Sequence, residues 1–184
     1  MKLILSDLKR YKNSFNNRFE WNEPSYIVIV LYRIGSSIRK IPFKPLRLLL
    51  SIIHTPFYAF FSIFMGISIP RGTKIGKAFR IYHFGGVVIN PLAVIGDNCS
   101  LHQGVTIGVR NTYTDVPIIG NNVTVGAGAK LLGEIRIGNN VIVGANAVVI
   151  DNVPDDSIAV GIPAKVYKKK FPINNGDNNI ETPW

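Results

Sequence analysis

An aliphatic residue recurs every six positions from Ile69 to Ile162, and this period constrains the fold more than any other feature of the chain. A fixed six-residue repeat predicts a parallel β-helix, in which three units close one triangular coil of about eighteen residues. A helical period of 3.6 fits none of these positions. A two-residue slip and a twelve-residue jump divide the repeat into three blocks: Ile69, Ile75, Ile81 and Val87; Ile89, Ile95, Leu101 and Ile107; Ile119, Val125, Leu131, Ile137, Val143 and Val149.

The same period predicts which side chains line the core. The aliphatic residue and a small residue before the next turn point inward and stack on their copies in neighbouring coils. With eighteen residues per coil, we expect Leu101, Ile119 and Ile137 on one face. Cys99, which is the only cysteine, occupies an inward small-residue position. It is therefore expected to pack in the core, and an intrachain disulfide is excluded.

The repeat also predicts the domain organisation. Residues 67–167 form the β-helix, and residues 1–66 form a short α-helical N-terminal region, with a helix expected over 25–39. A second apolar stretch, Leu46–Met65, is interrupted by Pro56. Residues 168–184 form a basic and then polar tail, predicted to be flexible. The fold class is mainly β. The first residues alternate between charged and apolar, which is not the pattern of a cleavable signal.

Charge is concentrated near the N-terminus of this chain, whose net charge is +10. Such a balance fits nucleic acid, an anionic membrane surface or a phosphorylated ligand. Nucleic acid is not favoured, because no nucleic-acid-binding motif accompanies the charge. Residues 48–70 carry no charge, and four cations precede them. This apolar segment could pack as a helical hairpin on the β-helix or partner subunits, lie in a membrane interface, or span a bilayer. The four cations are Arg39, Lys40, Lys44 and Arg47.

The three histidines have different surroundings in the repeat. His54 lies in the apolar N-terminal segment, which favours a packing role. His83 follows inward-pointing Ile81 by two places and precedes a glycine pair, which puts it at a corner outside the core. His102 directly follows inward-pointing Leu101 and points outward. Residues 108–118 break the repeat and are predicted to leave the prism as a loop on the binding side.

Familiar catalytic motifs are missing from the sequence. It contains no GxSxG elbow, HExxH motif, cysteine–histidine metal cluster or Walker loop. A chemistry that remains is direct acyl transfer, in which a histidine takes a proton from a hydroxyl and backbone N–H groups hold the oxyanion. No metal site is predicted.

Three stretches of the chain resemble a known enzyme group: IYHFGGVVINPLAVIGDNCSLHQGVTIG, IIGNNVTVGAGAKLLGEIRIGNNVIVGANAVV and VPDDSIAVGIPAKV. Together they resemble the left-handed parallel β-helix of hexapeptide acyltransferases in the serine acetyltransferase group. More closely, they are similar to capsular and colanic-acid-type polysaccharide O-acetyltransferases. The resemblance implies left-handed coils, a homotrimer, and acetyl-CoA bound between neighbouring prisms.

The resemblance also assigns roles to individual residues. His83 matches the catalytic histidine, which deprotonates the acceptor hydroxyl. His102, Gln103 and Asp115 are candidates for substrate contact. The residues that match acetyl-CoA-binding positions are Gly108, Gly126, Ala127, Ala145, Lys165 and Lys168.

Two departures from the serine acetyltransferase pattern bear on the acceptor. Ser68 stands where that group has an aspartate, and Asp115-Val116-Pro117 replaces an Arg-His-Pro segment. Without the arginine, the carboxylate of serine lacks its expected partner. The first interpretation is therefore O-acetylation of a sugar hydroxyl in a surface polysaccharide or its lipid-linked precursor, in the cytoplasm or at the inner face of the cell membrane. The alternative is serine O-acetylation in cysteine biosynthesis, and a third interpretation is a β-helix used only for assembly or binding.

Overall fold

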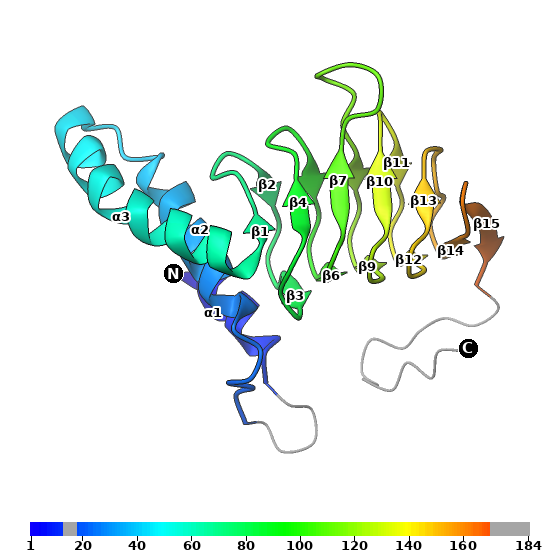
Figure 1. The fold of residues 1–184 in the computed structure, drawn as a ribbon, viewed down its shortest axis with the longest axis horizontal. Helices are drawn as coiled ribbons and strands as arrows, with labels where there is room; N and C mark the ends of the chain where they lie inside the picture. The colour runs from blue at the N-terminus through cyan, green and yellow to red at the C-terminus, as the bar shows by residue number, and fades with distance from the viewer. Residues whose placement is uncertain (13–17, 170–184) are drawn as a thin grey trace.

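Three helices precede a β-helix in the computed structural model, which describes residues 1–12 and 18–169. Figure 1 shows the helices gathered at one end of an elongated stack of coils. The helices are α1 (Lys2–Lys9), α2 (Ser25–Ile38) and α3 (Lys44–Met65). The predicted fold class, a β-helix with a short helical N-terminal region, is confirmed. Most of the tail predicted to be flexible, from residue 170 onward, lies outside the described residues.

The β-helix has three faces, each a sheet whose strands stack in parallel from coil to coil. Face 1 contains β1 (Ile67–Ser68), β4 (Val87–Ile89), β7 (Thr106–Gly108), β10 (Lys130–Leu132) and β13 (Val148–Val149). Face 2 contains β2 (Lys74–Ile75), β5 (Val94–Ile95), β8 (Ile118–Ile119) and β11 (Arg136–Ile137). Face 3 contains β3 (Arg80–Tyr82), β6 (Ser100–His102), β9 (Thr124–Val125), β12 (Ile142–Val143), β14 (Ser157–Val160) and the antiparallel β15 (Lys165–Lys168).

The inward aliphatic residues form the core as predicted, but one predicted stack is wrong. Ile119 pairs with Ile95 and Ile137 on face 2, whereas Leu101 lies on face 3 between Ile81 and Val125. The reason is that residues 109–117 leave the prism without contributing a strand, so this coil is longer than eighteen residues. Cys99 is buried as predicted, and desolvation raises the pKa of its thiol to about 11.

The edge between faces 2 and 3 is built by a ladder of asparagine and aspartate side chains. The Asp97 backbone N–H donates to Asn121 Oδ1, and the Asn121 N–H donates in turn to Asn139 Oδ1. The next residue in each coil has positive φ, a conformation that asparagine and aspartate adopt more readily than most residues. These residues are Asn98, Asn122, Asn140 and Asp156. The ladder accounts for the repeated acidic and amide pairs of the sequence without invoking a ligand.

The apolar segment is one continuous helix, so the predicted interruption at Pro56 is wrong. Proline removes one backbone hydrogen bond, but contacts on both sides of it hold α3 in place. His54 Nε2 bonds the Leu31 carbonyl oxygen of α2 at 2.9 Å, and the Tyr58 hydroxyl donates to the Ile69 carbonyl oxygen. The packing role of His54 is thereby confirmed. By length and composition alone, α3 could cross a membrane.

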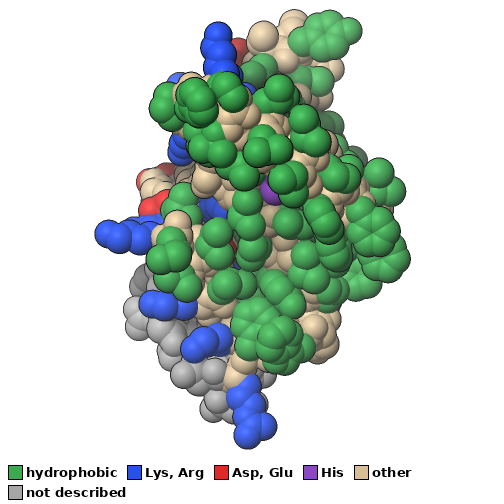
Figure 2. All heavy atoms as spheres, turned by 90° about the vertical axis from the view of Figure 1, so that its left-hand side faces the viewer, with side chains coloured by type: hydrophobic (Ala, Val, Ile, Leu, Met, Phe, Trp, Pro, Cys, Tyr) green, Lys and Arg blue, Asp and Glu red, His purple; other side chains and the backbone are tan. Residues whose placement is uncertain are grey.

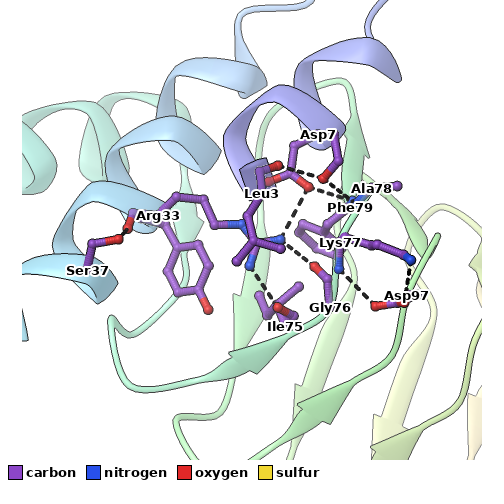
Figure 3. Close-up of polar contacts among 12 residues, drawn as sticks. Leu3, Asp7, Arg33, Ser37, Ile75, Gly76, Lys77, Ala78, Phe79 and Asp97 are labelled. Carbon is purple, nitrogen blue, oxygen red and sulfur yellow. Dashed lines mark hydrogen bonds and ion pairs between the residues drawn. The ribbon is translucent and has the colours of Figure 1, made fainter. Parts of the chain in front are cut away.

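A buried ion pair attaches α1 and α2 to the first coil (Figure 3). Arg33 Nε donates to Asp7 Oδ2 at 2.7 Å, and both side chains are almost fully buried. The other Asp7 oxygen accepts the Phe79 backbone N–H at 2.9 Å, while Arg33 also donates to the carbonyl oxygens of Ile75 and Gly76. Two helices and the β2–β3 turn thus share one charged network.

We expect Asp7→Ala to lower the free energy of unfolding by about 3–5 kcal/mol, because it leaves the Arg33 charge buried and unpaired. For a chain of this size the melting temperature should fall by roughly 10 °C. The matched control is Lys77→Ala, which breaks an exposed pair with Asp97 and should cost less than about 1 kcal/mol. Thermal denaturation followed by circular dichroism measures both, and equal losses would contradict this assignment.

Candidate functional site

The edge between faces 3 and 1 brings most of the predicted site residues into one line. We call it the His83 edge. Each coil contributes the residues that follow its face 3 strand, so positions separated by some twenty residues in sequence become neighbours in space. In chain order this edge carries His83, His102, Gln103, Gly126, Ala127 and Ala145, and the turn before Lys165 closes it.

His83 lies in a bulge that corresponds to the two-residue slip of the repeat. Tyr82 pairs with His102, and Gly86 stacks on Gly104, so three residues in one coil oppose a single residue in the next. The bulge carries His83 outside the prism, where its side chain is 62% exposed. Its φ is +62°, which is uncommon for a residue with a side chain. Such strain persists where surrounding contacts hold it, and it is frequent at functional sites.

Glu23 supplies those contacts from the N-terminal region. Its Oε1 lies 3.1 Å from His83 Nδ1, and its Oε2 accepts the His83 backbone N–H at 2.8 Å. One carboxylate therefore holds both the main chain and the ring of the histidine. The carboxylate favours a proton on Nδ1, which leaves the lone pair on Nε2 for a reaction.

Buried hydroxyl groups fix the position of Glu23 relative to the bulge. Two residues after Glu23, the Ser25 hydroxyl donates to the Ile81 carbonyl oxygen at 2.7 Å. The Tyr11 hydroxyl donates to the same oxygen at 3.1 Å and is buried with it. The start of α2 is thus fastened to β3 beside the histidine. Glu23 itself is largely buried, so its carboxylate has little freedom to turn away.

His102 lies in a stack of side chains on the outside of face 3. Its ring stacks on Tyr82 at a centroid distance of 4.8 Å, and the Arg80 guanidinium covers the other side of Tyr82 at 4.0 Å. Desolvation lowers the pKa of His102, and the nearby His83 and Arg80 lower it further. The lowered pKa favours the neutral ring, which can donate or accept a hydrogen bond. A contact of His102 or Gln103 with substrate stays a prediction.

The two glycines matched to acetyl-CoA binding, Gly108 and Gly126, have different steric surroundings. A Cβ on Gly126 would lie 2.6 Å from the backbone nitrogen of Ala145, so the stacking of coils alone demands glycine there. A Cβ on Gly108 would meet only Leu132 and Thr106 side-chain atoms at 3.8 Å, an ordinary contact. Among the described residues, no steric contact therefore demands glycine at position 108, and an acetyl-CoA contact there stays a prediction. Ala127 and Ala145 lie in turns on the His83 edge, where Ala145 is exposed.

The two lysines predicted to meet phosphates are exposed on β15. This strand pairs with β14 in an antiparallel register, with Lys165 opposite Val160 and Lys168 opposite Ser157. Both lysines therefore lie at the end of the prism remote from the helices (Figure 1). Their ammonium groups are available to an anionic ligand.

Residues 109–117 form the predicted loop, which leaves the prism at the edge between faces 1 and 2. In Figure 1 this loop projects from the top of the molecule, while the turn after β3 lies at the bottom. Although desolvation raises the pKa of Asp115, the N–H groups of Asn111 and Arg110 lower it more, at 2.7 and 3.2 Å from its oxygens. The Asp115 carboxylate thus links the end of the loop to its beginning. A role for Asp115 in substrate binding stays a prediction.

Sequence reasoning missed Glu23 as a site residue. Its sequence neighbours do not identify it, because its partner lies sixty positions away. One signal was present in the composition: Asp7, Glu20 and Glu23 are the only acidic residues before Asp97. In the described structure Asp7 and Glu20 form ion pairs with Arg33 and Arg80, and Glu23 contacts the His83 ring.

A parallel β-helix with an exposed, carboxylate-held histidine defines a class of transferase, and the comparisons agree. The family model for the bacterial transferase hexapeptide, six repeats, matches residues 117–151. A soybean serine acetyltransferase solved with serine is 30% identical, with a TM-score of 0.72, over 90% of this chain and 68% of that one. A serine acetyltransferase complex with CoA is 29% identical, with a TM-score of 0.70, over 89% and 68%.

Curated relatives show the same relationship. A serine acetyltransferase of Staphylococcus aureus is 48% identical over 108 residues, 58% of this chain and 51% of the relative. One from Synechococcus elongatus is 41% identical over 103 residues, 55% and 42% of the two chains. The chain thus spans about half the length of the curated relatives it matches. It belongs to the hexapeptide-repeat acyltransferases of the serine acetyltransferase group.

These matches contradict the first interpretation from sequence, O-acetylation of a polysaccharide. The relatives in both comparisons are serine acetyltransferases, which supports the alternative. The wrong interpretation rested on Ser68 and Asp115-Val116 standing where the group has an aspartate and an arginine. The structure shows that a different residue, Glu23, can orient the histidine. The absence of the family's aspartate at position 68 therefore did not exclude a carboxylate partner for the histidine.

Proposed function

We propose that this protein is an acetyl-CoA-dependent O-acetyltransferase whose acceptor is L-serine. The observation that carries the proposal is the Glu23 carboxylate bound to Nδ1 of an exposed histidine in a β-helix bulge. Support for the donor comes from the CoA complex of a similar protein, and support for the acceptor comes from the serine complex of another. The exposed lysines of β15 fit a phosphate-bearing substrate such as CoA.

In the proposed reaction His83 acts first as base and then as acid. Its Nε2 takes the proton of the serine hydroxyl while the hydroxyl oxygen forms a bond to the thioester carbonyl carbon. The carbon–sulfur bond then breaks, and His83 returns the proton to the departing CoA sulfur. Glu23 keeps Nε2 unprotonated at the start and stabilises the imidazolium that forms between the two steps. The products are O-acetylserine and free CoA.

Arg110 is proposed to bind the serine carboxylate. It is the only cation between Gly108 and Ile118, and it is exposed. It lines a cavity whose other polar side chains are Asn111, Thr112, Asp115 and Glu134. An arginine can hold a carboxylate with two parallel hydrogen bonds, which a glycan acceptor does not require. Arg110 would thus replace the arginine expected five positions further along the loop, where this chain has Asp115.

Arg110 and His83 lie on different edges of the same prism. The strand β7 (Thr106–Gly108) lies between the two edges of face 1, and three extended residues at about 3.3 Å each put the edges roughly 10 Å apart. One serine molecule cannot bridge that distance. A complete site therefore needs the loop of one copy beside the His83 edge of another, which supports the homotrimer implied by the resemblance.

The test is release of CoA thiol from acetyl-CoA, with L-serine and, as a control lacking the hydroxyl, L-alanine. We expect turnover only with L-serine and O-acetylserine as the product by mass spectrometry. Arg110→Ala should raise KM for serine by roughly tenfold or more while acetyl-CoA affinity stays unchanged, because it removes a charge-assisted pair. Arg136→Ala, an exposed arginine on β11, is the control. Acetyl-CoA binding without serine turnover would refute the acceptor, and absence of acetyl-CoA binding would refute the transferase.

A further inference from the structure

An extensive apolar surface covers α3 at the helical end of the molecule. Figure 2 looks onto this end and shows hydrophobic side chains over most of it, with lysine and arginine side chains at the edges. The large exposed side chains of α3 are Leu46, Leu48, Leu49, Ile52, Ile53, Phe57, Phe60, Ile63 and Phe64. We call this set the α3 apolar face. Isolated exposed hydrophobic residues are normal, but a contiguous surface of this kind marks an interaction site.

The width of the α3 apolar face indicates what covers it. At about 100° per residue, its members span about half the circumference of the helix. The opposite side, which includes buried His54 and Met65, packs on α2 and the first coil. One partner helix covers a narrower stripe. A half-cylinder about 33 Å long, with no charge after Arg47, fits the acyl boundary of a lipid leaflet.

A basic pocket adjoins the apolar face at the start of α3. Four cations line it together with Pro45, Leu48 and Ser51, and no acidic side chain does. Arg71, one of these cations, also donates to the Thr55 hydroxyl of α3 at 3.2 Å. Cations beside an apolar helix face are the arrangement that binds anionic headgroups while the helix enters the interface. The four cations are Arg39, Lys44, Arg47 and Arg71.

The charge of the surrounding chain favours lipid over a second copy as the occupant. From Pro24 to Gly96 the sequence has nine lysines and arginines and no aspartate or glutamate. Asp7, Glu20 and Glu23, the acidic residues that precede this stretch, already pair with Arg33, Arg80 and His83. A second copy docked through the same face would thus bring more cations and no available carboxylate. An anionic bilayer supplies the missing negative charge.

We propose that the α3 apolar face and its basic pocket dock this protein on an anionic phospholipid surface. Helix α3 would lie in the interface rather than cross it, because His54 and Tyr58 tie its other side to α2 and the first coil. The β-helix would then project away from the bilayer, since it extends from the helices in one direction (Figure 1). This inference is independent of the acceptor.

The test is flotation of the full chain with vesicles of phosphatidylcholine alone or mixed with phosphatidylglycerol. We expect binding to the anionic vesicles, weakened in about 0.5 M salt relative to about 0.05 M. Arg47→Gln and Arg71→Gln should each reduce the partition coefficient about fivefold, and the charge-matched control Arg136→Gln should not. Phe60→Ser with Ile63→Ser, which are 62% and 81% exposed, should abolish binding, whereas Tyr113→Ser should have no effect.

Two results would overturn the proposal. The first is equal, salt-insensitive binding to neutral and anionic vesicles, which would leave the basic pocket without a role. The second is no vesicle binding together with an assembly that Phe60→Ser and Ile63→Ser dissociate in analytical ultracentrifugation. In that case the α3 apolar face is an interface between copies of this chain.

Discussion

His83→Ala is expected to lower kcat about 10²–10⁴-fold with serine as acceptor, since this is the range that removal of a general base costs. The dissociation constant for acetyl-CoA should change little, because the matched CoA-binding positions lie in later coils than His83. Steady-state kinetics and calorimetric titration of CoA separate the two effects. The side chain is exposed, so the fold should tolerate its removal.

The matched control for this variant is His102→Ala, one coil away on the same edge. It removes a ring that stacks on Tyr82 and that does not take the proton in the proposed mechanism, so its effect should fall mainly on KM. Full activity in a folded His83→Ala protein would contradict the mechanism. A larger loss of kcat in His102→Ala than in His83→Ala would transfer the role of base to His102.

The sequence predicted most of the fold because its repeat is local. Aliphatic and glycine positions recur at a fixed spacing, so the sheet pattern, the corner position of His83 and the loop after Gly108 could all be derived from the period. The two errors arose where local rules do not apply. The Leu101 stack depended on how many residues the loop adds to its coil. The continuity of α3 through Pro56 depended on tertiary contacts of His54 and Tyr58, which no local rule contains.

The site was less predictable because it is assembled across the repeat boundary. The bulge was visible in the sequence as the two-residue slip of the repeat between Val87 and Ile89. Glu23, which binds His83 in this bulge, comes from a region without periodicity. The same limitation explains the wrong acceptor. Ser68 was compared with a family aspartate at a single position, whereas charge can reach the histidine from any segment that packs beside it. The useful signal was the small number of acidic residues before Asp97, rather than the comparison of a single position with a family pattern.

Glu23 is therefore expected to be the positioning residue for His83, and this prediction has the second largest effect. Glu23→Ala should lower kcat by about 10–100-fold, the usual cost of removing an outer partner of a functional histidine. Glu23→Gln should retain more activity than Glu23→Ala, because its amide oxygen can still accept from Nδ1 while the charge that stabilises the imidazolium is lost. KM for acetyl-CoA should stay unchanged in both.

A purely structural role would give a different result, and nitrogen NMR of the His83 ring distinguishes the two. In the native protein at a pH where the ring is neutral, the proton should reside on Nδ1; in Glu23→Ala it should distribute over both nitrogens. A structural role alone would lower the melting temperature and leave the tautomer unchanged. Because Glu23 binds Nδ1 through one oxygen and the His83 backbone N–H through the other, Glu23→Gln retains an acceptor at only one of these two positions. Native tautomer and native kcat in both variants would show that the bulge alone orients the histidine.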